Sequence, residues 1–111
     1  MYIFLDDERN PKTNKQWKIA RNGSDFRKLI KEWQSDKTDN QLECSLDHDL
    51  GEHTEDGYAL IKWMCEFLEQ HNMPQDILDN VIINIHSANP IGKGNIEGYW
   101  KSFRRYLASL I

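Results

Sequence analysis

Hydrophobic residues occur along the chain in short blocks, whose spacing distinguishes strands from helices. Runs of consecutive apolar residues predict buried strands. These runs are "MYIFL" (1–5), "LECSL" (42–46) and "NVIINI" (80–85), the last being the longest β-branched run. In "QWKIAR" (16–21) Trp17 and Ile19 alternate with polar neighbours, which predicts a half-buried or edge strand. The segment between the first two strands has no helical periodicity, so a helix there is short or missing.

Three other segments place apolar residues at the i, i+3, i+4, i+7 spacing of a helix face. Ser24 is the expected N-cap of the first helix, and Thr54 or Asp56 that of the second, which should end before Pro74. The third should begin near Asn95. The three apolar faces are Phe26, Leu29, Ile30 and Trp33; Leu60, Ile61, Met64, Phe67 and Leu68; and Ile96, Tyr99, Trp100, Phe103, Leu107 and Leu110.

Apolar strands alternating with amphipathic helices predict an α/β fold, a small doubly wound parallel sheet covered on both faces. The chain of 111 residues is expected to form one domain, 1–111. Right-handed crossovers lead to the strand order 2-1-3-4 if the chain later returns past the first strand. The carboxyl ends of the first and third strands then lie side by side, at the switch point where such sheets bind ligands.

Composition narrows the class of protein only modestly. The 39% hydrophobic and 29% charged residues are typical of a globular domain. No apolar run is long enough to span a membrane, and the N-terminus lacks the features of a signal peptide. Cys44 and Cys65 fall on predicted apolar faces and are expected to be buried free thiols, so the sequence predicts a cytoplasmic protein.

Charge is distributed unevenly around a net charge of −4. Residues 1–31 hold eight Lys or Arg against four Asp or Glu, residues 32–92 hold two against thirteen, and residues 93–111 hold four against one. An acidic centre between basic ends fits a site for metal and phosphate together, or simply a solvated acidic face.

Polar clusters follow three of the predicted strands. They are Asp6-Asp7, with Glu8 and Arg9 next; Asp47-His48-Asp49; and His86-Ser87-Ala88-Asn89-Pro90. Each cluster alone could form a turn or contain a core histidine. Because the carboxyl ends of parallel strands share one edge, all three are expected to meet there.

Carboxylates gathered at one edge repel each other unless a cation intervenes. A divalent cation held by Asp6, Asp7, Asp47 and Asp49 resolves this, with Mg²⁺ expected and Mn²⁺ or Zn²⁺ as alternatives because imidazoles lie nearby. Such a cation also positions phosphoryl groups. The other polar side chains could bind a phosphate or, in the case of histidine, transfer protons. The candidate phosphate ligands are Ser87, Asn89, Arg9, Arg21 and Lys93.

These residues resemble a known family. "FLDDE", "LDHDLG" and "HSANP" are similar to the receiver domains of response regulators, a flavodoxin-like fold. Receivers carry an acidic pair after strand 1, a phospho-accepting aspartate after strand 3 and Ser/Thr-Ala after strand 4. The corresponding positions are Asp6-Asp7, Asp47 and Ser87-Ala88. "SLDHDLG", "DGYAL" and "HSANP" together resemble more closely a divergent branch, the cyclic-phosphate processing receiver domains, over nearly the whole chain.

Departures from ordinary receivers shape what the resemblance implies. The chain has neither a fifth strand nor a "KP" motif, so Lys93 is the candidate substitute for the receiver lysine. His48 and His86 are additions to the signalling pattern. The resemblance thus implies a metal-dependent phosphoesterase, a hydrolase acting on cyclic phosphates of nucleotides or RNA ends, with a place in RNA processing. Its catalytic residues would be His48 and His86 as general acid and base, with Asp47 as a nucleophile or a metal ligand.

Two other functions remain open: a phospho-switch modified on Asp47, and a non-catalytic interaction module. "KSFRRYL" (101–107) mixes basic and aromatic residues, but helical spacing assigns the aromatic ones to the core. No extended nucleic-acid surface and no membrane contact are therefore expected, and the sequence leaves the oligomeric state open.

Overall fold

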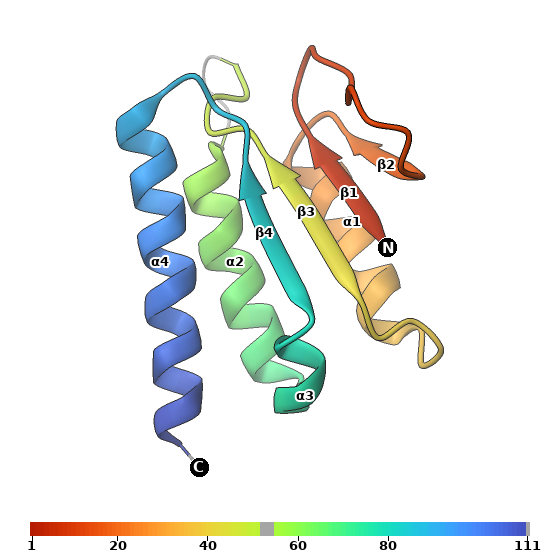
Figure 1. Cartoon of the computed structure of the whole chain (residues 1–111), viewed down its shortest axis with the longest axis vertical. Helices are drawn as coiled ribbons and strands as arrows, with labels where there is room; N and C mark the ends of the chain where they lie inside the picture. Colours follow the sequence, from red (N-terminus) through yellow and green to blue (C-terminus); the bar gives the residue numbers. More distant parts are fainter. Residues whose placement is uncertain (52–54, 111) are drawn as a thin grey trace.

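The computed structural model of the chain describes residues 1–51 and 55–110. Strands and long helices alternate along the described chain after an initial pair of strands, and a short helix follows the second long one (Figure 1). Their bounds are β1 (Tyr2–Leu5), β2 (Trp17–Ala20), α1 (Gly23–Ser35), β3 (Leu42–Leu46), α2 (Gly57–Gln70), α3 (Gln75–Leu78), β4 (Val81–Ile85) and α4 (Pro90–Ser109). The predicted order of strands and long helices is confirmed, and the short helix α3 was not predicted.

The strands form one parallel sheet in the order β2-β1-β3-β4, which confirms the predicted receiver-like topology. Leu5 pairs with Leu46, and Leu46 pairs with Ile85, so β1, β3 and β4 end at the same level. Backbone bonding continues one residue further, because the Asp47 N–H donates to Leu5 O and the His86 N–H to Leu46 O. The residues that follow these strands therefore emerge together at one edge.

The helices of the described residues pack on one face of the sheet. Helices α1 and α2 lie behind the strands in Figure 1, and α4 packs against α2 and β4. On the two central strands, β1 and β3, the side chains that face the helices are fully buried, as at Ile3, Leu5 and Cys44. Alternate positions face the other way, and among them Ile19 is 40% and Ile82 50% exposed.

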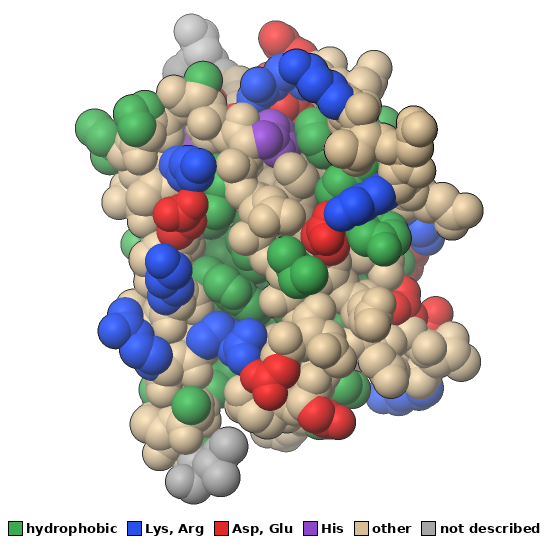
Figure 2. All heavy atoms as spheres, viewed as in Figure 1, with side chains coloured by type: hydrophobic (Ala, Val, Ile, Leu, Met, Phe, Trp, Pro, Cys, Tyr) green, Lys and Arg blue, Asp and Glu red, His purple; other side chains and the backbone are tan. Residues whose placement is uncertain are grey.

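We refer to this second side of the sheet as the open face. Its in-register positions are Tyr2, Phe4, Trp17, Ile19, Glu43, Ser45, Ile82 and Asn84. Figure 2 looks onto it and shows hydrophobic side chains exposed among charged ones. The expectation of helices on both faces is wrong within the described chain. A right-handed crossover from β1 to β2 would place a helix here, but residues 6–16 form no helix.

Capping side chains set the helix boundaries. Asn22, not the expected Ser24, caps α1, because its side-chain oxygen accepts the backbone N–H of Asp25. Asp56 caps α2 as predicted, and α2 ends before Pro74. The alternative cap, Thr54, lies outside the described residues. Helix α4 begins five residues earlier than expected, at Pro90 rather than Asn95, because the Asn89 side chain caps it.

Both cysteines are buried free thiols, as predicted. Burial raises the pKa of Cys44 and of Cys65, so both remain protonated and unreactive at neutral pH. None of the described helices combines the length and apolar character needed to cross a membrane.

Candidate functional site at the carboxyl edge of the sheet

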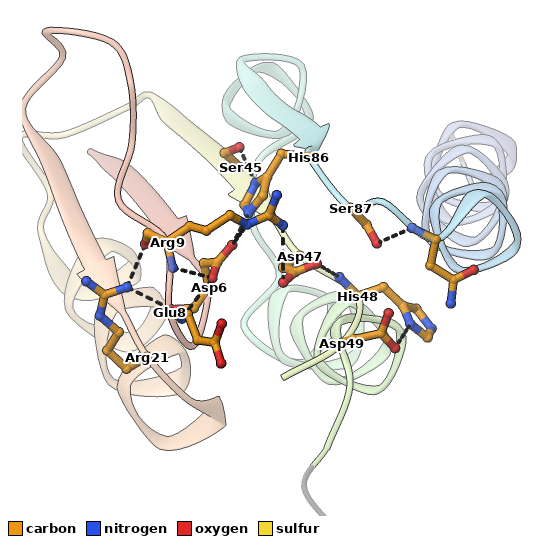
Figure 3. Close-up of polar contacts among 11 residues, drawn as sticks. Asp6, Glu8, Arg9, Arg21, Ser45, Asp47, His48, Asp49, His86 and Ser87 are labelled. Atoms are coloured by element: carbon orange, nitrogen blue, oxygen red, sulfur yellow. Dashed lines mark hydrogen bonds and ion pairs between the residues drawn. The ribbon is translucent and has the colours of Figure 1, made fainter. Parts of the chain in front are cut away.

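Three of the predicted site residues converge beyond the strand ends. Asp6 follows β1, Asp47 follows β3 and His86 follows β4, and one potential ligand atom from each lies within 4.8 Å of the other two (Figure 3). Asp6 is 1% and Asp47 7% exposed, while His86 is half-buried. We call these three residues the edge cluster. Because β3 lies between β1 and β4, the side chains of Asp6 and His86 reach toward each other from strands that do not pair.

The Asp6 carboxylate is the most heavily hydrogen-bonded group of the edge cluster. Its Oδ1 accepts the backbone N–H groups of Glu8 and Arg9 at 2.9 and 2.7 Å, and its Oδ2 contacts the His86 ring and the Arg9 side chain. Burial alone would raise the pKa of Asp6. The two backbone donors, His86 and Arg9 together outweigh burial and lower that pKa from 3.8 to about 2, so the carboxylate is ionised at neutral pH.

Arg9 bridges the two buried carboxylates. Its Nε lies 2.9 Å from Asp6 Oδ2, and its Nη2 lies 3.5 Å from Asp47 Oδ2. Hydrogen bonding and charge attraction to Asp6, then to Asp47, raise the pKa of Arg9. The guanidinium thus offsets part of the repulsion between the two carboxylates. From the sequence, we expected a metal ion alone to offset this repulsion. Because the side chain is 52% exposed, the guanidinium also remains accessible to a ligand.

Ser45 extends the edge cluster onto the open face. Its hydroxyl lies 2.8 Å from His86 Nδ1, and His86 Nε2 lies 2.9 Å from Asp6 Oδ2, so the ring is held at both nitrogens. The His86 ring also stacks on Phe4, with centroids 4.4 Å apart and planes 5° apart. Sequence reasoning missed Ser45. The signal was present, because Ser45 and Glu43 are polar residues that alternate with the apolar residues of this strand.

The loop after β1 is held by Arg21. One nitrogen of its guanidinium, Nη1, donates to the backbone carbonyls of Asp6 and Arg9, and the other, Nη2, donates to the Asn10 side chain at 2.5 Å. The sequence predicted Arg21 as a phosphate ligand. The structure places it against the loop backbone instead, where it fixes the position of Arg9 and the backbone donors to Asp6.

His48 is turned away from the edge cluster toward the start of α4 (Figure 3). Its Nδ1 lies 3.0 Å from Asp49, its Nε2 lies 3.5 Å from Asp56, and its ring packs against Gly92. A Cβ at Gly92 would come within 2.3 Å of that ring, so glycine is required there. The structure therefore does not bring His48 together with His86, and the predicted acid-base pairing of the two rings stays a prediction.

Gly57, the first residue of α2, packs closely against the backbone of Asp47. A Cβ at Gly57 would lie 2.1 Å from the carbonyl oxygen of Asp47, and the Gly57 N–H donates to His48 O at 2.7 Å. The first turn of α2 therefore packs directly on the backbone of the Asp47-His48 segment. This contact fixes the direction in which Asp47 leaves the sheet.

The residues after β4 mainly begin helix α4. The Ser87 Oγ accepts the Asn89 N–H at 3.0 Å, which leaves its hydroxyl proton free to donate. The Asn89 side-chain oxygen accepts the Gly92 N–H as the helix cap. Lys93 is exposed in the first turn of α4. Of the three predicted phosphate ligands here, Ser87 directly follows His86 of the edge cluster in the chain.

Two of the predicted metal ligands lie outside the edge cluster. Asp7 is half-buried beside Asp6, but its carboxylate does not join the convergent group among the described residues. The side chain of Asp49 is 68% exposed and contacts His48. His86, predicted as a proton carrier, provides the third potential ligand atom instead.

The donor set of the edge cluster suits a divalent cation. A cation about 2.0 to 2.4 Å from each donor requires donors no more than about 4.8 Å apart, which the three atoms satisfy. Two carboxylates and one imidazole favour Mn²⁺ or Zn²⁺ more than the oxygen-only site first expected for Mg²⁺.

Fold and site together define the class of protein. A parallel 2-1-3-4 sheet with carboxylates after β1 and β3 and a Ser-Ala pair after β4 is a receiver-like domain. The chain belongs to the cyclic-phosphate processing Receiver domain family, whose model matches residues 1–102. No curated protein and no solved structure matches the chain. The family resemblance inferred from the sequence is thus confirmed, and cyclic-phosphate processing implies a phosphate substrate.

Proposed function

We propose that the domain is a metal-dependent phosphoesterase that opens cyclic phosphates of nucleotides or RNA ends. The convergence of Asp6, Asp47 and His86, with the Arg9 guanidinium across the two carboxylates, carries this proposal. The family name supports the substrate class. In the proposed reaction, water adds its oxygen to phosphorus, one of the two ring P–O bonds breaks, and the leaving oxygen takes up a proton.

Asp6, Asp47 and His86 would hold the cation, His86 through Nε2. When bound, the cation supplies Lewis-acid polarisation of the phosphate and lowers the pKa of water. The protein's own contribution is orientation. Asp6 is fixed by two backbone N–H groups, Asp47 by the His48 N–H at 2.9 Å, and His86 by Ser45. Ligands held this firmly lose little further freedom when the cation binds.

Arg9 and Ser87 would bind the phosphate oxygens. The exposed guanidinium of Arg9 can keep one contact with a carboxylate and turn other N–H groups to an anion, since it has five donors. The Ser87 hydroxyl has a free proton, because its oxygen already accepts the Asn89 N–H. Figure 3 shows Arg9 and Ser87 on either side of Asp47, from where they would stabilise the charge that develops on the phosphate as water attacks.

The direct test is hydrolysis of adenosine 2′,3′-cyclic phosphate with Mn²⁺, Zn²⁺ or Mg²⁺ added separately. We expect turnover with at least one metal, and a loss of about 100-fold or more in Asp47→Asn, since even changes to the residues that orient a metal ligand cost about 10- to 100-fold in metal affinity or activity. The proposal is contradicted if, with every metal, the unaltered domain turns over no faster than Asp47→Asn.

The same assay decides what His86 does. As a ligand, His86→Gln loses both metal binding and turnover. As a proton carrier only, His86→Gln keeps the metal and loses turnover together with one limb of the pH-rate profile. Arg105→Ala is the matched control, because Arg105 is exposed on α4, away from the edge cluster.

A second candidate function is a phospho-switch, favoured by the position of Asp47 at the end of β3, where receivers accept phosphate. Against it, the described sheet ends at β4, so no further strand supplies the receiver lysine. Treatment with acetyl phosphate followed by intact mass measurement separates the two. A stable phospho-adduct that is absent in Asp47→Asn favours the switch, and its absence favours the phosphoesterase.

A further inference from the structure

A cavity of about 510 Å³ opens on the open face directly beside the edge cluster. It is lined by Phe4, Arg9, Asn10, Lys12 and His86. Its volume falls in the range of about 300 to 1,000 Å³ that is typical of small-molecule sites. Because Arg9 and His86 also belong to the phosphate site, a ligand with its phosphate at the edge cluster has its remaining atoms within reach of this cavity.

Aromatic rings line one part of the cavity. Phe4 and His86 stack in nearly parallel planes, and the edge of Trp17 packs on Phe4 with ring centroids 5.8 Å apart. Phe4 is 8% exposed and the His86 side chain 20% exposed, so each ring presents only part of its surface to the cavity. A flat aromatic surface of this kind suits a planar ring system better than an aliphatic chain.

Basic side chains and one amide line the rest of the cavity. Lys12 is exposed and has no ion-pair partner among the described residues, so its charge is available to a ligand. Arg9 lies at the boundary with the edge cluster. Asn10 brings an amide whose oxygen is already engaged by Arg21, which leaves its N–H groups free to donate. An aromatic surface with cations and an amide beside it matches a planar heterocycle joined to an anion.

We propose that this cavity binds the nucleoside of the substrate, with the base against the Phe4 and His86 rings and Lys12 beside its sugar-phosphate. The inference rests on the proposed function and adds the part of the site that would recognise the base of a nucleotide, either free or at the end of an RNA. Cyclic phosphates that lack a base would fill only the edge cluster. Stacking of one base on an aromatic side chain strengthens binding about 10-fold or more.

Calorimetric titration with adenosine 3′-monophosphate and with inorganic phosphate, both in saturating Mn²⁺, tests the inference without turnover. We expect the nucleotide to bind at least about 10-fold more tightly than phosphate. Lys12→Ala should weaken nucleotide binding several-fold and phosphate binding to a smaller extent. Phe4→Leu should bring the two affinities together, and its unfolding curve checks that it folds. Lys31→Ala, an exposed lysine on α1, is the matched control and should match the unaltered chain.

Equal affinity for the two probes, or nucleotide binding that neither Lys12→Ala nor Phe4→Leu alters, overturns the inference. Turnover separates it from the proposed function. Equal hydrolysis of glycerol 1,2-cyclic phosphate and adenosine 2′,3′-cyclic phosphate supports the phosphoesterase function but contradicts the nucleoside site. The opposite result is nucleotide binding that depends on Phe4 and Lys12, without hydrolysis of any cyclic phosphate. It supports the nucleoside site but contradicts the phosphoesterase function.

Discussion

His86 Nε2 lies 2.9 Å from Asp6 Oδ2, although 80 positions separate the two residues in the sequence and a third strand separates their own strands. This contact spans the end of β3 and joins the first strand to the last. Asp6 is ionised and accepts only, so a neutral His86 must carry its proton on Nε2, and Nδ1 then accepts the Ser45 hydroxyl. The site is therefore ordered by hydrogen bonds of the protein itself.

Metal binding should raise the melting temperature. A cation at about 100 times its dissociation constant stabilises the folded state by about 2.7 kcal/mol, a rise in Tm on the order of 10 °C for a domain of this size. Differential scanning fluorimetry with Mn²⁺ or Zn²⁺ measures it. Asp47→Asn should abolish the rise, whereas Asp49→Asn, outside the edge cluster, should keep it. An equal loss in both variants would show that Asp49 also holds the cation.

The proton on His86 should move when zinc binds. Without metal, we expect the Nε2–H form. A cation on Nε2 needs that lone pair, so the proton should move to Nδ1 and Ser45 should change from donor to acceptor. Long-range ¹⁵N–¹H NMR of the imidazole reports the tautomer directly. Ser45→Ala should weaken zinc binding roughly 10-fold through this lost contact. An Nδ1–H form already present without metal would contradict this prediction.

Acid should destabilise the domain through Asp6. Its pKa in the folded state, about 2, lies below the usual 3.8, so the carboxylate contributes stability above pH 4 and loses it as the pH falls from about 4 to 2. The expected loss is about 2 kcal/mol. Urea unfolding between pH 5 and pH 2 measures it. Asp6→Asn should be less stable at pH 5 and should show a smaller acid loss, while Asp7→Asn should retain the full loss. Identical pH dependence in the two variants would rule out this role of Asp6.

Alanine substitutions at two glycines should change the stability of the domain in opposite directions. Gly57→Ala places a methyl group against the backbone oxygen of Asp47, which cannot move without shifting the strand end, so we expect a loss of about 3 kcal/mol or more. Gly94→Ala, on α4 with no neighbour within 4 Å of the added methyl, should gain about 0.5 to 1 kcal/mol. Urea denaturation of both variants measures the difference. A neutral Gly57→Ala would show that α2 does not fix Asp47.

Most of the fold was predictable because its determinants are local. Consecutive apolar residues give the buried strands, and the 3.6-residue period gives the long helices. Apart from the expected helix layer on the second face of the sheet, which residues 6–16 do not supply, the errors lie at boundaries, where several capping residues compete. Asn22 and Ser24 are both good N-caps, and only the path of the chain after β2 decides that Asn22 bonds the Asp25 N–H. Helix α3 is four residues long, too short for a period to be read.

The candidate site was predictable in its location but not in its partners. Parallel strands bring their carboxyl ends to one edge whatever the side chains are, so three polar clusters had to meet there. Contacts between residues far apart in the sequence decide which side chains point into the edge cluster. His48 and His86 look equivalent in the sequence, but Gly92 and the two flanking carboxylates hold His48 aside, whereas Phe4 and Ser45 hold His86 at the centre.

The sequence by itself determined the parallel α/β topology, the family and the edge where chemistry is concentrated, because periodicity and strand-end residues are properties of short segments. Only the tertiary structure decided that Asp6, Asp47 and His86 form one group, that Arg21 holds the loop, and that one face of the sheet is open beside them. Those outcomes depend on the packing of strands and loops far apart in the chain, and on the absence of a helix between β1 and β2. Local pattern cannot specify how such distant segments contact one another.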